Sequence, residues 1–186
     1  MGLKLDKIHV LIAEDHAHMR RMIKAILDSF GITHIREAPS GEDALRMMEI
    51  IVPDLLITDW DMRMMDGLEL IRHIRTHPDS PNHYLPIIMI TGFAARERVY
   101  RARDAGVNEL LVKPITAKGM YSRLAAVVER PRDFVRTKTF FGPDRRRKVD
   151  PNFKGDDRRG KGAAPKIPVA PGAEMSQRQI NKLFNP

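Results

Sequence analysis

The sequence of 186 residues contains no cysteine. A chain without thiols cannot build a disulfide framework, use thiol catalysis or bind a metal through cysteine, and its composition fits a reducing compartment. No apolar run approaches the roughly 18 residues of a membrane span. The first residues, MGLKLDK, are interrupted by charges and lack a signal-peptide pattern. We therefore expect a cytoplasmic protein with no membrane insertion.

The net charge of +8 is concentrated at one end of the chain. Residues 1–130 carry 18 basic and 18 acidic side chains, whereas residues 131–186 carry the other 14 basic and 6 acidic ones. This asymmetry predicts a neutral globular domain followed by a basic appendage.

Five short apolar segments alternate with amphipathic ones over the first 130 residues. The expected strands are 8–13, 32–37, 55–58, 87–91 and 108–112, and the expected helices lie near 19–30, 41–51, 67–74, 94–104 and 116–129. Strands that are apolar on both faces and alternate with helices indicate a parallel sheet covered by helices. We predict an α/β fold over residues 1–130: a (βα)₅, doubly wound, five-stranded parallel sheet.

The pattern stops after Pro131. Residues 131–173 are basic, rich in glycine and proline near their end, and without the periodicity of a core, so we expect a largely disordered linker. Residues 174–186 predict one short interaction helix, because Ser176 and Gln179 have capping-box spacing and Ile180, Leu183 and Phe184 share an apolar face.

Polar side chains follow four of the expected strands. They are Glu14 and Asp15, Asp59 and Asp61, Thr91, and Lys113. Because ligands bind beyond the carboxyl ends of parallel strands, we expect these groups to meet at one edge of the sheet. Clustered carboxylates repel unless a cation joins them, and hard oxygen ligands favour Mg²⁺. Such a site, with a lysine and a hydroxyl beside it, suits phosphoryl transfer to a carboxylate.

The motifs VLIAED (10–15), DWDMRMMDGLEL (59–70) and LLVKPIT (110–116), taken in this order, resemble the receiver domain of two-component response regulators, in particular the stand-alone chemotaxis type. The resemblance covers about residues 6–130 and implies a flavodoxin-like fold. It also implies a phosphorelay protein that takes a phosphoryl group from a sensor histidine kinase or a histidine phosphotransfer protein and signals to a downstream protein. Such a protein turns over no external substrate and is not an enzyme in that sense.

The resemblance assigns roles by position. Asp59 corresponds to the phosphoacceptor and Asp15 to a direct Mg²⁺ ligand. Glu14 would hold the ion through water, and the backbone carbonyl of Asp61 would be a further ligand. Thr91 and Lys113 would contact the phosphoryl group, Gly67 would permit the turn into the following helix, and a cis bond would precede Pro114.

This sequence departs from the family pattern in the loop after Asp59 and at the switch position. Arg63 replaces the usual proline. Leu110 replaces the usual switch tyrosine or phenylalanine, so the switch formed by Thr91 and Leu110 must signal without an aromatic ring. Phe93, near Thr91, offers no group that could position water, which predicts a long-lived phosphoryl group.

Two other functions fit parts of the sequence. An aspartate-nucleophile phosphatase would also use Asp59, Asp61, Thr91 and Lys113 in this order, but it would place an acidic pair after the lysine, where none follows an apolar strand here. Alternatively, the basic tail binds nucleic acid through clusters such as 145–148, although it has neither a helix-turn-helix pattern nor zinc ligands.

The terminal MSQRQINKLFNP resembles the N-terminal peptide of flagellar switch proteins, with basic or amide residues in place of acidic ones. We expect self-association through it, within the chain or with a second copy. Its predicted docking site is the face formed by the fourth helix, fifth strand and fifth helix.

Overall fold

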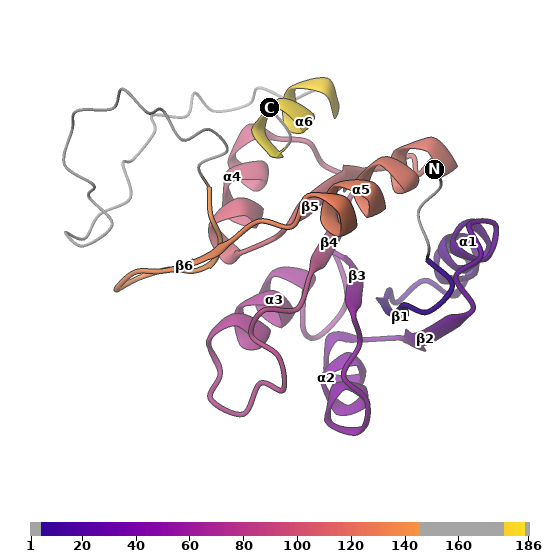
Figure 1. Ribbon diagram of the computed structural model, residues 1–186, viewed down its shortest axis with the longest axis horizontal. Coiled ribbons are helices and arrows are strands. Elements are labelled where there is room, and N and C mark those ends of the chain that lie inside the picture. Colours follow the sequence, from indigo (N-terminus) through magenta and orange to yellow (C-terminus); the bar gives the residue numbers. More distant parts are fainter. Residues whose placement is uncertain (1–4, 146–176, 185–186) are drawn as a thin grey trace.

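The computed structural model describes residues 5–145 and 177–184 (Figure 1). Five strands form a parallel sheet in the order β2-β1-β3-β4-β5. They are β1 (His9–Ala13), β2 (His34–Ala38), β3 (Leu55–Asp59), β4 (Ile87–Thr91) and β5 (Glu109–Val112). The helices between and after them are α1 (Ala17–Asp28), α2 (Gly41–Ile50), α3 (Gly67–Thr76), α4 (Arg96–Ala105) and α5 (Ala117–Glu129). The predicted (βα)₅ parallel sheet is confirmed.

Local sequence signals set the helix starts. The Ser40 hydroxyl accepts from the Asp43 backbone N–H at the start of α2, and the Thr116 hydroxyl accepts from that of Gly119 at the start of α5. Asp66 and Glu69 form a capping box at the start of α3. The caps of α3 and α5 fix where the chain turns after β3 and β5, and those turns carry Asp61 and Lys113 of the candidate site.

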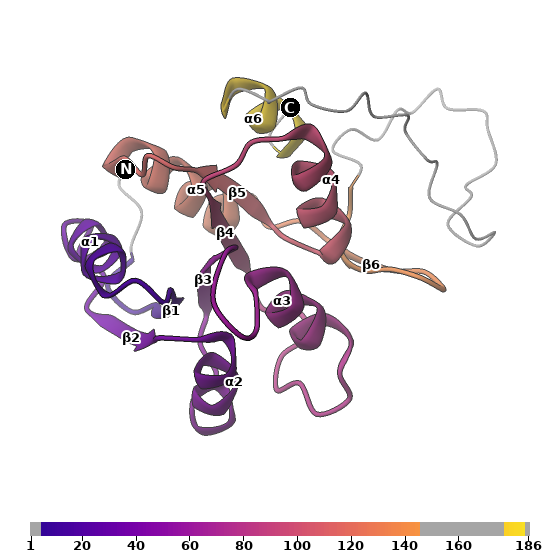
Figure 2. The same cartoon turned by 180° about the vertical axis from the view of Figure 1, so that it is seen from behind.

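Helices cover both faces of the sheet (Figure 2), and an apolar core lies on each face. Ile12 and its neighbours pack with α1 and α5, whereas Leu11 and its neighbours pack with α2, α3 and α4. Alternating residues of the same strand therefore serve opposite cores. Among the residues of known placement, no helix is both long and apolar enough to cross a membrane.

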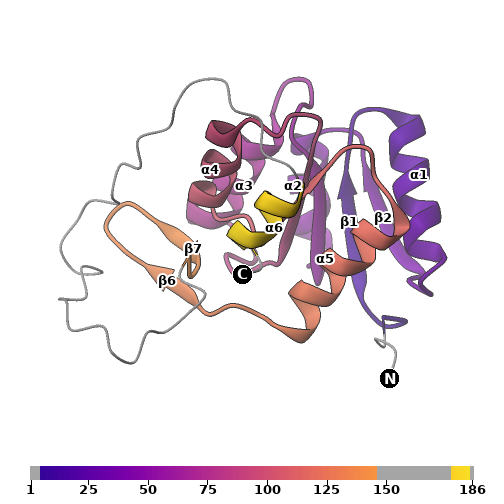
Figure 3. The same ribbon diagram turned by 90° about the horizontal axis from the view of Figure 1, so that it is seen from above.

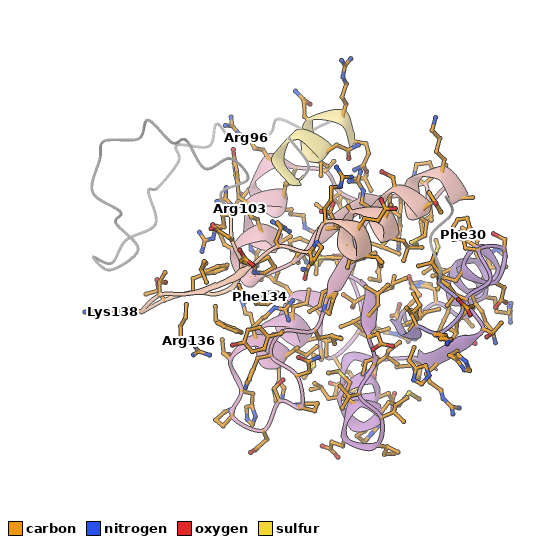
Figure 4. All side chains as sticks on the ribbon, viewed as in Figure 1. Phe30, Arg96, Arg103, Phe134, Arg136 and Lys138 are labelled. Carbon is orange, nitrogen blue, oxygen red and sulfur yellow. The ribbon has the colours of Figure 1, made fainter. Side chains whose placement is uncertain are left out.

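An antiparallel hairpin occupies part of the region expected to be a disordered linker. It consists of β6 (Phe134–Arg136) and β7 (Phe141–Pro143). Figure 4 marks Phe134 at the base of this hairpin, and the Phe134 and Phe141 rings each lie 5.2 Å from that of Tyr84. The expectation of a linker from residue 131 is therefore wrong for residues 134–143, because their aromatic side chains pack on the domain. Residues 146–173 lie outside the described part of the chain.

A last helix, α6 (Gln177–Phe184), lies against β5 beside α4 and α5 (Figure 3). Ile180 of this helix is fully buried. Ser176, expected to cap the helix, and the side chains of Leu183 and Phe184, expected on its apolar face, lie outside what the structure describes.

Candidate functional site

The carboxyl ends of β1, β3 and β5 bring acidic and basic side chains together. Lys113 Nζ lies 2.8 Å from Asp59 Oδ1 and 3.7 Å from Glu14 Oε2. Asp59 and Glu14 are buried, and the Lys113 side chain is one-quarter exposed. Three residues that are far apart in the sequence thus form one charged cluster at this edge of the sheet.

Burial and mutual charge perturb this cluster. Desolvation raises the pKa of Glu14 above its ordinary value, and the nearby Asp59 carboxylate raises it further. Burial alone would lower the pKa of Lys113, but the hydrogen bond and charge of Asp59 outweigh it and raise that pKa. The lysine therefore stays cationic at neutral pH and balances part of the buried negative charge.

Asp15 follows Glu14 and is held by groups from two directions. Its Oδ2 accepts from the backbone N–H and from Nε of Arg63, each at 3.3 Å, and its Oδ1 lies 2.8 Å from His16 Nδ1. Burial would raise the pKa of Asp15, but the Arg63 hydrogen bonds and the His16 charge lower it below its ordinary value. Asp15 is therefore a carboxylate at neutral pH.

The same residues could hold a cation. Glu14, Asp15 and His16 each offer one ligand atom, and these atoms lie within 4.8 Å of one another. Glu14 Oε2, Asp15 Oδ1 and Asp59 Oδ1 are buried, and the groups of known placement beside them are the Lys113 ammonium and the His16 ring, at 2.8 to 3.7 Å, so each oxygen can accept a further ligand. Buried carboxylate oxygens left in this state fit a site completed by a hard divalent ion.

The loop after β3 passes close to Asp59 because a glycine lies at its end. A Cβ on Gly67 would lie 2.0 Å from the Asp59 backbone oxygen, so a larger residue cannot occupy this position without moving the chain. The Gly67 N–H donates to the Trp60 carbonyl, which brings the start of α3 against the end of β3. The Asp61 N–H donates in turn to Asp59 Oδ2 at 3.2 Å.

Thr91 and Leu110 lie on the neighbouring strands. Thr91 is buried at the end of β4, and its hydroxyl hydrogen-bonds the backbone N–H and carbonyl of Phe93. Leu110 is fully buried and lies beside Met89 in the register of β4 and β5. The Lys113–Pro114 peptide bond is cis.

Arg98 of α4 contributes to the site although the sequence alone did not single it out. It donates to both carboxylate oxygens of Asp61, at 2.6 and 3.2 Å. Its guanidinium also lies 4.7 Å from the Trp60 ring and 4.8 Å from the Phe93 ring. The Asp61 side chain therefore faces α4, and only its backbone follows Asp59 closely. The one feature of the sequence that could have pointed to Arg98 is the arginine-rich composition of residues 96–103.

Two further residues contact Asp15: His16, which the sequence did not single out, and Arg63, which it marked only as a departure from the family pattern. The sequence-predicted residues Glu14, Asp15, Asp59 and Lys113 come together, whereas Ile180 lies with α6 on β5.

Comparison with known proteins gives consistent matches. The family model for the response regulator receiver domain matches residues 10–125. The chemotaxis protein CheY of Pseudomonas aeruginosa is 39% identical over 121 residues, which cover 65% of this chain and 96% of that protein. The chemotaxis protein CheY-3 of Vibrio cholerae is also 39% identical over 121 residues, covering 65% of this chain and 92% of that protein.

Solved structures show the same fold. The Vibrio cholerae chemotaxis protein CheY4 superposes with a TM-score of 0.60 at 26% identity, over 65% of this chain and 98% of that one. A putative response regulator from Chloroflexus aurantiacus gives a TM-score of 0.60 at 30% identity, over 67% of this chain and 100% of that one.

Proposed function

Because the chain belongs to the response regulator receiver family, we propose that Asp59 accepts a phosphoryl group from the phosphohistidine of a sensor histidine kinase or a histidine phosphotransfer protein. The observation that carries this proposal is the cluster at the strand ends. Lys113 Nζ is 2.8 Å from the Asp59 carboxylate, with the buried Glu14 and Asp15 carboxylates at the same edge.

The proposed cofactor is Mg²⁺. The Asp15 and Asp59 carboxylates and the Asp61 backbone carbonyl would bind it directly, and Glu14 would hold it through water. The buried oxygens of Glu14, Asp15 and Asp59, which lie together at this edge and can each accept a further ligand, support this assignment. When bound, Mg²⁺ would neutralise charge on the oxygens of the transferred group.

The chain's own residues have distinct roles in the transfer. An Asp59 oxygen attacks phosphorus, the P–O bond forms as the P–N bond to the donor imidazole breaks, and the imidazole leaves with the electron pair. Lys113 balances charge on the phosphoryl oxygens. The Thr91 hydroxyl exchanges its bond with the Phe93 backbone for one to the phosphoryl group. The product is an acyl phosphate on Asp59.

The protein then signals through contacts with a downstream protein. A phosphoryl group adds charge beside Lys113 and Thr91, which biases the conformations that a partner can bind. Leu110, buried on β5, gives this receiver no switch ring to turn inward. We assign the receiver to residues 1–130, with the hairpin of 134–143 as an appendage, and expect no turnover of an external metabolite.

A small donor with a P–N bond tests the proposal. Wild-type protein incubated with phosphoramidate and Mg²⁺ should gain one phosphoryl group in intact-mass spectra, whereas Asp59→Asn should gain none. Asp61→Asn is the matched control, because the Asp61 side chain faces Arg98 and its backbone is unchanged. Equal labelling of wild type and Asp59→Asn would exclude Asp59 as the acceptor.

A further inference from the structure

Arg63 contacts the Asp15 carboxylate through two different groups. Its backbone N–H and its side-chain Nε both donate to Asp15 Oδ2, each at 3.3 Å. The Arg63 side chain is 88% exposed, whereas that of Asp15 is only 8% exposed. The guanidinium therefore lies on the solvent side of a nearly buried carboxylate, and its charge can be removed without removing the backbone donor.

The backbone N–H holds the carboxylate in place whichever side chain follows it, unless the residue is proline, which has no N–H to donate. The loop that carries this N–H is fixed at its far end. Met65 packs against the apolar core beside α2, and the Gly67 N–H donates to the Trp60 carbonyl. Loss of the guanidinium should therefore leave the orientation of Asp15 unchanged.

The guanidinium adds positive charge to the place where a divalent ion would bind. Glu14, Asp15 and Asp59 bring three carboxylates to this edge of the sheet, and the Lys113 ammonium balances one of them. Two negative charges then remain, which a divalent ion would match, and Arg63 reduces them to one. A like charge beside a cation site weakens the binding of the cation.

Solvent reaches this carboxylate on the side where Arg63 lies. An open hollow of about 660 Å³ is lined by Asp15 and Arg63, together with Asp61 and Asp66 of the same loop. A charge that acts through water is screened by salt, because the Debye length falls from about 10 Å at 0.1 M to about 3 Å at 1 M. The influence of the exposed guanidinium should therefore fade as the ionic strength rises.

We propose that Arg63 lowers the affinity of the strand-end site for Mg²⁺ through its charge, while its backbone N–H keeps Asp15 oriented as a ligand. The guanidinium and the ion compete for the same carboxylate. Occupancy of the site then depends more steeply on the Mg²⁺ concentration and on ionic strength than it would with a neutral residue at position 63. This inference rests on the proposed Mg²⁺ site.

Mg²⁺ titrations followed by the fluorescence of Trp60 test the proposal. Trp60 is the only tryptophan of the sequence, is buried, and follows Asp59 directly. Arg63→Gln keeps a side-chain donor but loses the charge. At low ionic strength it should bind Mg²⁺ about two- to fivefold more tightly than wild type, which is the range expected for the loss of an exposed ion pair.

Two variants separate the charge at position 63 from other effects. Arg63→Lys keeps the charge and should bind Mg²⁺ as wild type does. Arg21→Gln removes a positive charge from an exposed position of α1 and should also match wild type. In 1 M KCl the difference between Arg63→Gln and wild type should disappear. The Mg²⁺ dependence of the melting temperature gives a second measure of each dissociation constant.

Three results would overturn the proposal and leave the Mg²⁺ site in place. They are equal or weaker Mg²⁺ binding by Arg63→Gln, equally tightened binding by Arg63→Lys, and a tightening that persists in 1 M KCl. If Mg²⁺ changes neither the fluorescence nor the melting temperature of any of these proteins, the proposed Mg²⁺ site fails together with the inference.

Discussion

Arg98 restrains the carboxylate that lies nearest to the proposed phosphoacceptor along the chain. Its two hydrogen bonds to Asp61 and its position over Trp60 and Phe93 hold the Asp61 side chain toward α4. A carboxylate freed from this pair could accept a proton from water and orient it for attack on phosphorus. We therefore expect this arginine to slow the hydrolysis of an acyl phosphate on Asp59.

We predict that Arg98→Ala shortens the lifetime of the phosphorylated protein by roughly tenfold, which corresponds to about 1.4 kcal/mol of activation free energy. The decay of phosphoprotein in intact-mass spectra measures this lifetime. Arg101→Ala is the control, because Arg101 also lies over Trp60, at 5.9 Å, on the same helix. An unchanged lifetime in Arg98→Ala, or equal shortening in both variants, would refute the role of Arg98.

A second prediction at this scale concerns the stacked rings of His73 and His77, whose centroids are 4.1 Å apart. Burial lowers the pKa of His73, the His77 charge lowers it further, and Asp79 opposes both. Just below the ordinary value of 6.5 the unfolded chain therefore binds a proton that the folded chain does not. The free energy of unfolding should fall as the pH drops from 6.5 to the lower pKa of the folded state.

Urea denaturation at several pH values measures this slope. His73→Gln should remove the part of this pH dependence that His73 causes. The free energy of unfolding of the variant should therefore fall less than that of wild type between pH 6.5 and the lower pKa of the folded state. A steeper decline in His73→Gln would contradict the assignment.

At the scale of elements, the hairpin depends on one buried arginine of α3. Arg75 donates to the carbonyl oxygens of Gly106 and His83 and to Asn108 Oδ1, and its guanidinium lies 5.0 Å from the Phe134 ring. Burial lowers the pKa of Arg75 to about 9, so the side chain stays charged at neutral pH. Arg75 thus connects α3, the start of β5 and the hairpin.

We predict that Arg75→Met destabilises the protein by about 2–4 kcal/mol, because buried carbonyl oxygens lose their donors. The free energy of unfolding in urea measures the loss. Arg72→Met is the control, because Arg72 is exposed on the same helix. A loss below that of the control would show that the hydrogen bonds of Arg75 do not stabilise the fold.

The sequence predicted what depends on local pattern. Five apolar segments alternating with amphipathic ones were enough for the sheet and its helices. The ends of the expected strands were enough to place Glu14, Asp59 and Lys113 at one edge. The hairpin was missed because its stability comes from Tyr84 and Arg75, which are distant in the sequence. The pair between Arg98 and Asp61 was missed for the same reason: it exists only because α4 packs beside the loop after β3.

At the scale of the whole molecule, metal binding at the strand ends should stabilise the fold, because an ion that binds only the folded state shifts the equilibrium toward it. At a free Mg²⁺ concentration 100-fold above its dissociation constant the gain would be about 2.7 kcal/mol. We predict a higher melting temperature with Mg²⁺ than after its removal by a chelator.

The variant Asp15→Asn should lose this stabilisation, because it removes a proposed ligand. Asp79→Asn removes a charge from an exposed side chain in the loop after α3 and should keep it. Equal Mg²⁺ shifts in Asp15→Asn and wild type would place the ion elsewhere.

The most direct test of the account identifies the phosphorylated atom. Protein treated with phosphoramidate and Mg²⁺ is reduced with borohydride, which converts an aspartyl phosphate to homoserine, and its peptides are sequenced by mass spectrometry. The account predicts homoserine at position 59 and aspartate at positions 15 and 61. Homoserine at either of those two positions, or none anywhere in a protein that has gained a phosphoryl group, would contradict it.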